Sequence, residues 1–154
     1  MYHNLEWIHD LDIDYDSSTF DTDPFEPQPD GVGTIFPFRM NGTHPQPGYI
    51  ELPYTLPQDF LLFIVLKHKN IEVWKKKLDW IAEKGGMANV IVHPDYMNFG
   101  GTDLSFEEYP AEYFKELLDY VKSRYEGKYW HALPKDVAKI YREYLFRNIG
   151  RIKQ

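Results

Sequence analysis

The residues of this chain best suited to chemistry are His93, Asp95 and Tyr96, which directly follow the apolar run 88–92. The pair of glycines at 85–86 ends a helical pattern just before this run. The sequence therefore predicts a helix end, a buried strand and then a sharp exit that carries a histidine, a carboxylate and a phenol. In parallel α/β folds, catalytic side chains gather where strands end and loops begin.

The expected strand before His93 has two different faces because side chains alternate along a strand. Asn89, Ile91 and His93 share one face, which we expect to look into a barrel interior or a cleft. The other face carries only small apolar side chains, at Ala88, Val90 and Val92. An imidazole in this place can protonate a leaving group or stabilise an oxyanion, because histidine titrates near neutral pH. The alternative is a structural histidine that is hydrogen-bonded to a loop carbonyl.

An acidic segment is the second candidate. Its six carboxylates are Asp14, Asp16, Asp21, Asp23, Glu26 and Asp30. Oxygen ligands at this density can bind a hard cation or orient a sugar hydroxyl, but their spacing does not match an EF-hand. Aspartate is also a common turn former, so we expect this segment to be a solvated loop whose aspartates cap turns.

The composition excludes several classes of function. The net charge is −7, which disfavours nucleic acid, and the six scattered histidines form no H-x-x-x-H or H-E-x-x-H metal motif. There are no cysteines, no signal-peptide pattern and no apolar run that is long enough to span a bilayer, so we expect a cytoplasmic protein. Aromatic residues make up 17% of the chain and suit a core or sugar-stacking surfaces.

The hydrophobic pattern predicts an α/β fold with about five strands in a single domain over 1–154. Strands are expected at 13–15, 34–38, 49–52, 88–92 and 130–133. Helices are expected over 4–10, from Pro57 through Ile64, from Asn70 to Gly85, over 110–125, and from Pro134 through Leu145. Because helices and strands alternate from residue 70 onward, we expect parallel strands with the helices packed outside.

Six segments in a fixed order carry a family resemblance. They are Tyr15–Ser18, Asp21–Pro27, Ile35–Phe38, Glu51–Asp59, Val92–Tyr96 and Trp130–Leu133. Together they resemble the C-terminal part of a polysaccharide deacetylase domain, the NodB-homology or carbohydrate esterase family 4 group. The resemblance spans almost the whole chain and implies a partial, distorted (β/α) barrel. It also implies hydrolysis of acetyl groups from a bacterial polysaccharide with a divalent metal, usually zinc.

The resemblance gives roles to single residues. Ile91-Val92-His93 matches the final Leu-x-His motif of the family, which makes His93 the counterpart of its general acid. The segment Asp16–Asp23 falls where an Asp/Trp motif would lie, although no Trp follows. From this comparison we expect substrate contacts from Asp16, Asp21, Asp23, Asp95 and Tyr96.

Three motifs of this family are missing from the chain: the Asp-Asp pair and the H-x-x-x-H motif, which supply the metal ligands, and the Arg-x-Pro motif, which helps to complete the site. We therefore expect no metal site within this chain and no activity of the chain alone. A partner chain that carries the missing half, or self-association, is expected to complete the protein. Two alternatives remain. One is a non-catalytic carbohydrate-binding or assembly module in which Tyr54 and Tyr96 stack on sugar rings. The other is a structural remnant that is stable as a dimer.

Overall fold

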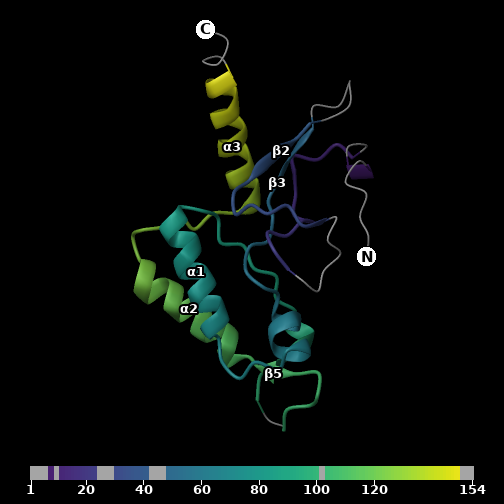
Figure 1. The fold of residues 1–154 in the computed structure, drawn as a ribbon, viewed down its shortest axis with the longest axis vertical. Coiled ribbons are helices and arrows are strands. Elements are labelled where there is room, and N and C mark those ends of the chain that lie inside the picture. The colour runs from purple at the N-terminus through teal and green to yellow at the C-terminus, as the bar shows by residue number, and fades with distance from the viewer. Residues whose placement is uncertain (1–6, 9–10, 24–29, 42–47, 101–102, 150–154) are drawn as a thin grey trace. The chain divides into compact units, whose positions relative to one another are not determined.

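The computed structural model describes residues 7–8, 11–23, 30–41, 48–100 and 103–149. The chain forms two compact units (Figure 1): unit 1 comprises residues 1–55 and 131–154, and unit 2 comprises residues 56–130. The helix expected over 4–10 lies mostly outside the described residues, and so does Glu26 of the acidic segment. The prediction of a single domain stays a prediction.

Unit 1 contains a small mixed sheet with the strand order β1-β3-β2. β1 (Tyr15–Asp16) runs parallel to the central strand β3 (Tyr49–Glu51), whereas β2 (Phe38–Met40) runs antiparallel to β3. This antiparallel pair lies before residue 70, outside the stretch for which parallel strands were expected. Its physical reason is the short connection between β2 and β3, since a parallel pair needs a crossover of about a dozen residues or more.

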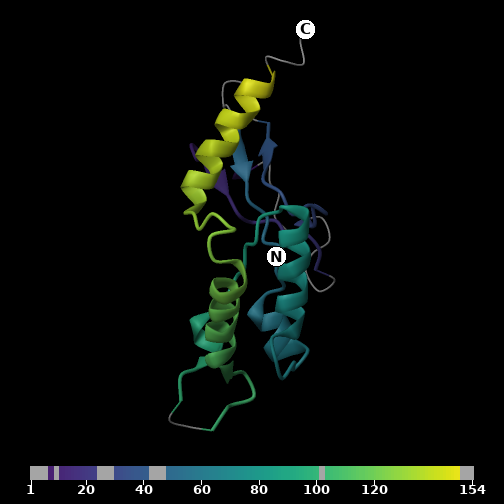
Figure 2. The ribbon, with the colours of Figure 1, turned by 90° about the vertical axis from the view of Figure 1, so that its left-hand side faces the viewer.

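The last helix, α3 (Pro134–Ile149), begins at the predicted proline and packs on β1 and β3 of the same unit (Figure 2). Ala138 is buried on this side, and the guanidinium of Arg142 donates to Asp14 Oδ1 at 2.8 Å and to the Asp14 carbonyl at 2.9 Å. Ile140 and Tyr144 on the same helix are exposed. They lie off the stripe that runs through Ala138 and Arg142 at helical spacing.

Unit 2 begins with a buried π-helical turn, η3 (Phe60–Val65), in place of the helix expected from Pro57. The amide of Leu66 donates to the Leu61 carbonyl at 2.9 Å, five residues back, as a π-helix requires. Leu61, Leu62, Phe63 and Ile64 are all buried.

The first long helix, α1 (Glu72–Lys84), confirms the sequence pattern. Its buried stripe consists of Trp74, Leu78 and Ile81, with Ile71 just before it. Asn70 Oδ1 accepts the amide of Glu72 at 3.1 Å. Gly85 ends the helix in the left-handed region at a φ of 68°, where its amide bonds to Ala82. Both ends were predicted from the same residues.

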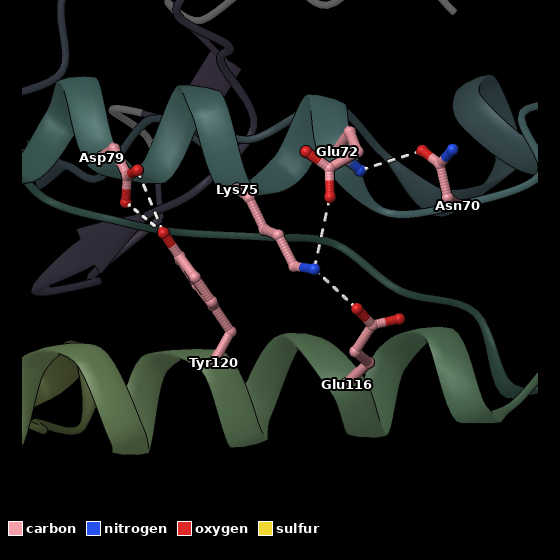
Figure 3. Close-up of polar contacts among 6 residues, drawn as sticks. All are labelled: Asn70, Glu72, Lys75, Asp79, Glu116 and Tyr120. Carbon is pink, nitrogen blue, oxygen red and sulfur yellow. Dashed lines mark hydrogen bonds and ion pairs between the residues drawn. The ribbon is translucent and has the colours of Figure 1, made fainter.

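α2 (Glu112–Tyr125) lies along α1 and is joined to it by polar contacts (Figure 3). Lys75 Nζ lies 2.6 Å from Glu116 and 3.3 Å from Glu72, and Asp79 accepts the hydroxyl of Tyr120 at 2.8 Å. Hydrogen bonds from Tyr125 and Tyr120 hold the pKa of Asp79 below its usual range. Leu117 occupies the inward position of this turn, so the neighbouring Leu118 faces solvent.

Three of the expected strands differ from the structure. The one expected at 34–38 shares only Phe38 with β2, because residues 35–36 form a bend and the strand continues to Met40. The other two are not strands. Residues 88–92 form a half-buried extended segment, held to the segment before η3 by the amide of Leu56 on the Asn89 carbonyl at 3.0 Å. Residues 130–133 are not a strand either, and Trp130 is 56% exposed. The described residues instead form a short parallel pair, β4 (Met97–Asn98) with β5 (Tyr109–Pro110), and their sheets are small and do not close into a barrel.

We expect Trp74→Ala to lower the free energy of unfolding of unit 2 by about 3–5 kcal/mol, because the indole is fully buried in its core. The substitution also removes the hydrogen bond from Nε1 to the Pro57 carbonyl at 2.7 Å. Urea denaturation followed by far-UV circular dichroism measures the change. Trp80→Ala is the matched control on the same helix, because Trp80 is 43% exposed. An equal loss in both variants would contradict the assigned core.

Candidate functional site

The best-defined polar site of unit 2 is built around the carboxylate of Asp59, whose side chain is fully buried. Asp59 stands immediately before η3, in helical conformation, and its amide donates to the Ile91 carbonyl at 3.4 Å. A carboxylate buried in this way is costly unless each of its oxygens is hydrogen-bonded. The surrounding chain supplies these hydrogen bonds.

Each oxygen of the Asp59 carboxylate has two hydrogen-bond partners. Oδ1 receives the amide of Phe60 at 2.8 Å and lies 2.6 Å from Nδ1 of His93. Oδ2 receives the amide of His93 at 2.6 Å and the hydroxyl of Tyr109 at 2.9 Å. Three of these partners, the two backbone amides and the Tyr109 hydroxyl, are donors, and an ionised carboxylate has room for a fourth. The arrangement therefore fits Asp59 as an anion.

This set of donors fixes the protonation of His93. An ionised carboxylate cannot donate, so Nδ1 of the imidazole carries the proton that lies between the two side chains. The neutral ring then presents an unprotonated Nε2, and the charged ring presents an Nε2 that can give up its proton. The His93 side chain is 39% exposed, so the ring is open to solvent although its orienting partner is buried. A buried carboxylate that orients a half-exposed imidazole is the arrangement used in general acid–base catalysis.

Tyr109 supports this pair from β5. Its side chain is buried, and burial, together with the neighbouring charge of Asp59 and the hydrogen bond to it, raises the pKa of the Tyr109 phenol well above its usual range. The phenol is therefore neutral around neutral pH and can donate its proton to Asp59. A tilted ring contact with Phe63, with centroids 4.7 Å apart, holds the Tyr109 ring in place.

Aromatic rings border the imidazole. After His93 the chain turns through the 3₁₀ helix η4 (Pro94–Tyr96), in which the amide of Tyr96 donates to the His93 carbonyl at 3.1 Å. This turn places the Tyr96 ring 5.4 Å from the His93 ring and 5.3 Å from the ring of Phe60. Phe60 is exposed and Tyr96 is half-exposed. Together they form a partly open aromatic surface beside the histidine.

Some of the predicted site residues lie in this site and others do not. His93 and Tyr96 are at its centre, and Asp95 is exposed on the η4 turn next to them. Asp16, Asp21 and Asp23 belong to unit 1. Asp21 and Asp23 are buried, as is Asp30, which corrects the expectation of a solvated acidic loop. The amides of residues 20 and 21 are hydrogen-bonded to carbonyls of Asp30 and Tyr54, and this pairing draws the segment into the core.

The described residues offer no metal site. No three His, Cys, Asp or Glu side chains in this part of the chain gather closely enough to hold a metal ion. The residues present therefore do not fit the divalent metal that the family resemblance implies. Likewise, no helix among the described residues is both long and apolar enough to cross a membrane.

Sequence reasoning missed Asp59 and Tyr109. Asp59 directly precedes an apolar run of the sequence. If this run is buried, the carboxylate is buried with it and needs a hydrogen-bonding partner. This pattern could have identified Asp59 from the sequence. Its pairing with His93 is long-range and could not be read from spacing. Nothing in the sequence distinguishes Tyr109 from the other tyrosines of the chain, of which there are 12 in total, so its role could not be predicted.

Comparison of this chain with models of known protein families, with curated proteins and with solved structures finds no match. The arrangement of Asp59, His93 and Tyr109 thus stands on its own geometry.

We expect Asp59→Ala to lower the free energy of unfolding of unit 2 by about 2–4 kcal/mol, because it leaves several buried donors without an acceptor. Asp95→Ala is the control, since Asp95 is exposed. Nitrogen-15 spectra of the imidazole supply a second measurement: neutral His93 should carry its proton on Nδ1 in the wild type. A neutral wild-type ring protonated on Nε2 would show that Asp59 does not orient it.

Proposed function

We propose that the chain provides the acid–base group of a hydrolase that removes acetyl groups from a polysaccharide, with His93 as general acid and Asp59 as its positioning residue. The observation that carries this proposal is the 2.6 Å contact between His93 Nδ1 and the buried Asp59 Oδ1. It leaves Nε2 as the atom that exchanges a proton with substrate. The family resemblance supplies the reaction class.

The chemical role of the pair follows from its charges. When the bond between the acetyl carbon and the sugar nitrogen or oxygen breaks, the leaving group develops negative charge and needs a proton. The charged imidazole gives this proton from Nε2, and the anion of Asp59 stabilises the charged ring before transfer and holds its direction throughout. Tyr109 and the amides of Phe60 and His93 keep Asp59 ionised and in place.

Phe60 and Tyr96 support a saccharide as the substrate class. Flat aromatic faces pack against the apolar faces of sugar rings, and the Tyr96 hydroxyl adds a polar tip. The rings of Phe60 and Tyr96 contact each other, and the Tyr96 ring also contacts the His93 imidazole. Asp95, on the same turn, is exposed and can accept hydrogen bonds from sugar hydroxyls.

General acid catalysis alone contributes about 10²- to 10⁴-fold, which is far below the total acceleration of most enzymes. The metal-ligand motifs of the resembling family are missing from the sequence, so we propose that a partner chain or a second copy supplies the remaining catalytic groups. The open aromatic surface beside His93 also favours a second candidate, a non-catalytic carbohydrate-binding module on the same scaffold.

We expect the chain to bind a chitin tetramer, an oligosaccharide of N-acetylglucosamine, and Tyr96→Ala to weaken this binding about tenfold, because it removes a stacking surface. Nuclear magnetic resonance titration measures it, with shift changes expected at His93 and Tyr96. Tyr129→Phe is the control, as an exposed aromatic of the same unit away from the η4 turn. Shift changes confined to other residues would contradict the assigned binding surface.

We expect His93→Ala to lower acetate release about 10²- to 10⁴-fold once the chain is combined with a polypeptide that carries the Asp-Asp and H-x-x-x-H motifs. Asp59→Asn should give a loss of the same kind, whereas His68→Ala should leave acetate release unchanged. Unchanged turnover in His93→Ala would remove His93 from the mechanism. Oligosaccharide binding without acetate release in any combination would favour the binding module.

A further inference from the structure

Unit 1 contains a second buried carboxyl group, that of Glu51 in β3, and its surroundings differ from those of Asp59. The Glu51 side chain is fully buried in the small sheet. In the parallel pairing of β1 with β3, Asp16 is the register partner of Glu51, so the two side chains leave neighbouring strands on the same face. Tyr49, two residues earlier in β3, shares this face.

The hydrogen bonds to Glu51 all fall on one oxygen. Oε1 accepts the amide of Ser18 at 3.1 Å, the amide of Thr19 at 3.0 Å and the hydroxyl of Thr19 at 2.7 Å. Oε2 is buried and accepts no hydrogen bond from any described residue, and the same holds for Oδ2 of Asp16. An ionised carboxylate with a bare buried oxygen next to a second carboxylate is an unfavourable arrangement.

The groups around Glu51 do not neutralise its charge. Burial raises the pKa of Glu51, the negative charge of Asp16 raises it further, and the hydrogen bonds from Thr19 and Ser18 oppose this only in part. Burial and the same two carboxyls raise the pKa of the Tyr49 phenol, which therefore stays neutral.

Among the described residues, no basic side chain of the other packed elements is hydrogen-bonded or ion-paired with Glu51. On β2, Phe38 is the register partner of Glu51, and Arg39 pairs with Ile50, whose side chain points to the opposite face. On α3, Arg142 is bonded to Asp14. Tyr141 on the same helix is a phenol whose pKa is raised by burial.

We propose that Glu51 is a neutral carboxylic acid in the folded protein at neutral pH, with its proton on Oε2, and that its ionisation is a switch that loosens β1 from β3. The proton belongs on Oε2 because Oε1 already accepts three donors. The neutral acid removes the charge repulsion with Asp16 and replaces a buried charge by a buried neutral group, which is less costly to desolvate. Ionisation of Glu51 restores the buried charge and its repulsion with Asp16. This happens at the edge of the sheet, where β3 is the one strand that pairs with β1 among the described residues.

The direction of the pH dependence follows from proton linkage. A carboxyl that binds its proton more tightly in the folded state favours folding at low pH. Stability is therefore lost as the pH rises from the unfolded value, about 4.3, through the folded pKa. Within that window the unfolding equilibrium constant rises up to about tenfold per pH unit. Asp79 and Glu108 give the stability the opposite pH dependence, because their pKa values are lowered in the folded protein and their contributions to stability are lost as the pH falls.

Hydrogen exchange of two backbone amides tests the switch. The amides of Ile50 and Leu52 donate across the strand pair to the carbonyls of Asp14 and Asp16. Between pH 5 and pH 8 their protection factors should fall in the wild type, by up to about tenfold per pH unit within the window. In Glu51→Gln, which has the shape of the neutral acid, they should stay level. Glu83→Gln is the control, because Glu83 is an exposed glutamate of α1. In this variant the protection factors of the two amides should change with pH as they do in the wild type.

Carbon-13 shifts of the Glu51 carboxyl in the unmutated chain give a direct measurement that does not depend on any variant. The expected result is a neutral acid at pH 7, and Asp16→Asn should lower the pH at which Glu51 ionises. A Glu51 that is ionised at pH 7 would overturn the proposal. So would stability at pH 7 that rises with added sodium or potassium ions, because a bound cation would then replace the proton.

Discussion

The charge of Asp59 is the constraint on which unit 2 depends. A fully buried carboxylate has to be satisfied by the chain around it, and here the donors come from the start of η3, from the extended segment that ends at His93 and from β5. These three segments are distant in sequence, and the short pair β4–β5 offers little pairing of its own to hold them. The geometry at His93 is thus a by-product of satisfying one buried anion.

The fold was predictable where local rules acted alone. The stripe of Trp74, Leu78 and Ile81 and the left-handed Gly85 followed from helical spacing and capping. The segment 88–92 was wrong as a strand because it makes isolated hydrogen bonds with residues 56 and 59 and does not join a ladder. The exposure of Ile140, Tyr144 and Leu118 could not be read from the sequence, because helix periodicity gives the direction of a buried stripe but not its width.

The candidate site was predictable only in part, for the same reason. His93 and Tyr96 were found because a sharp exit after an apolar run is a local signal. The partner of His93 lies 34 residues away, and no spacing rule connects the two. The buried aspartates of unit 1 were misjudged because aspartate in a turn-rich segment looks solvated until tertiary pairing buries it.

The four hydrogen bonds to Asp59 also bear on how this pair would change under natural selection. Two of the four come from backbone amides, so Asp59 would be retained for stability even in a chain that had lost every catalytic role. Its presence in a related sequence would therefore not separate active proteins from inactive ones. The exposed side of the His93 imidazole and the ring of Tyr96 do not satisfy a buried charge in this way. Substitutions at these two places would therefore report on function more directly than substitutions at Asp59.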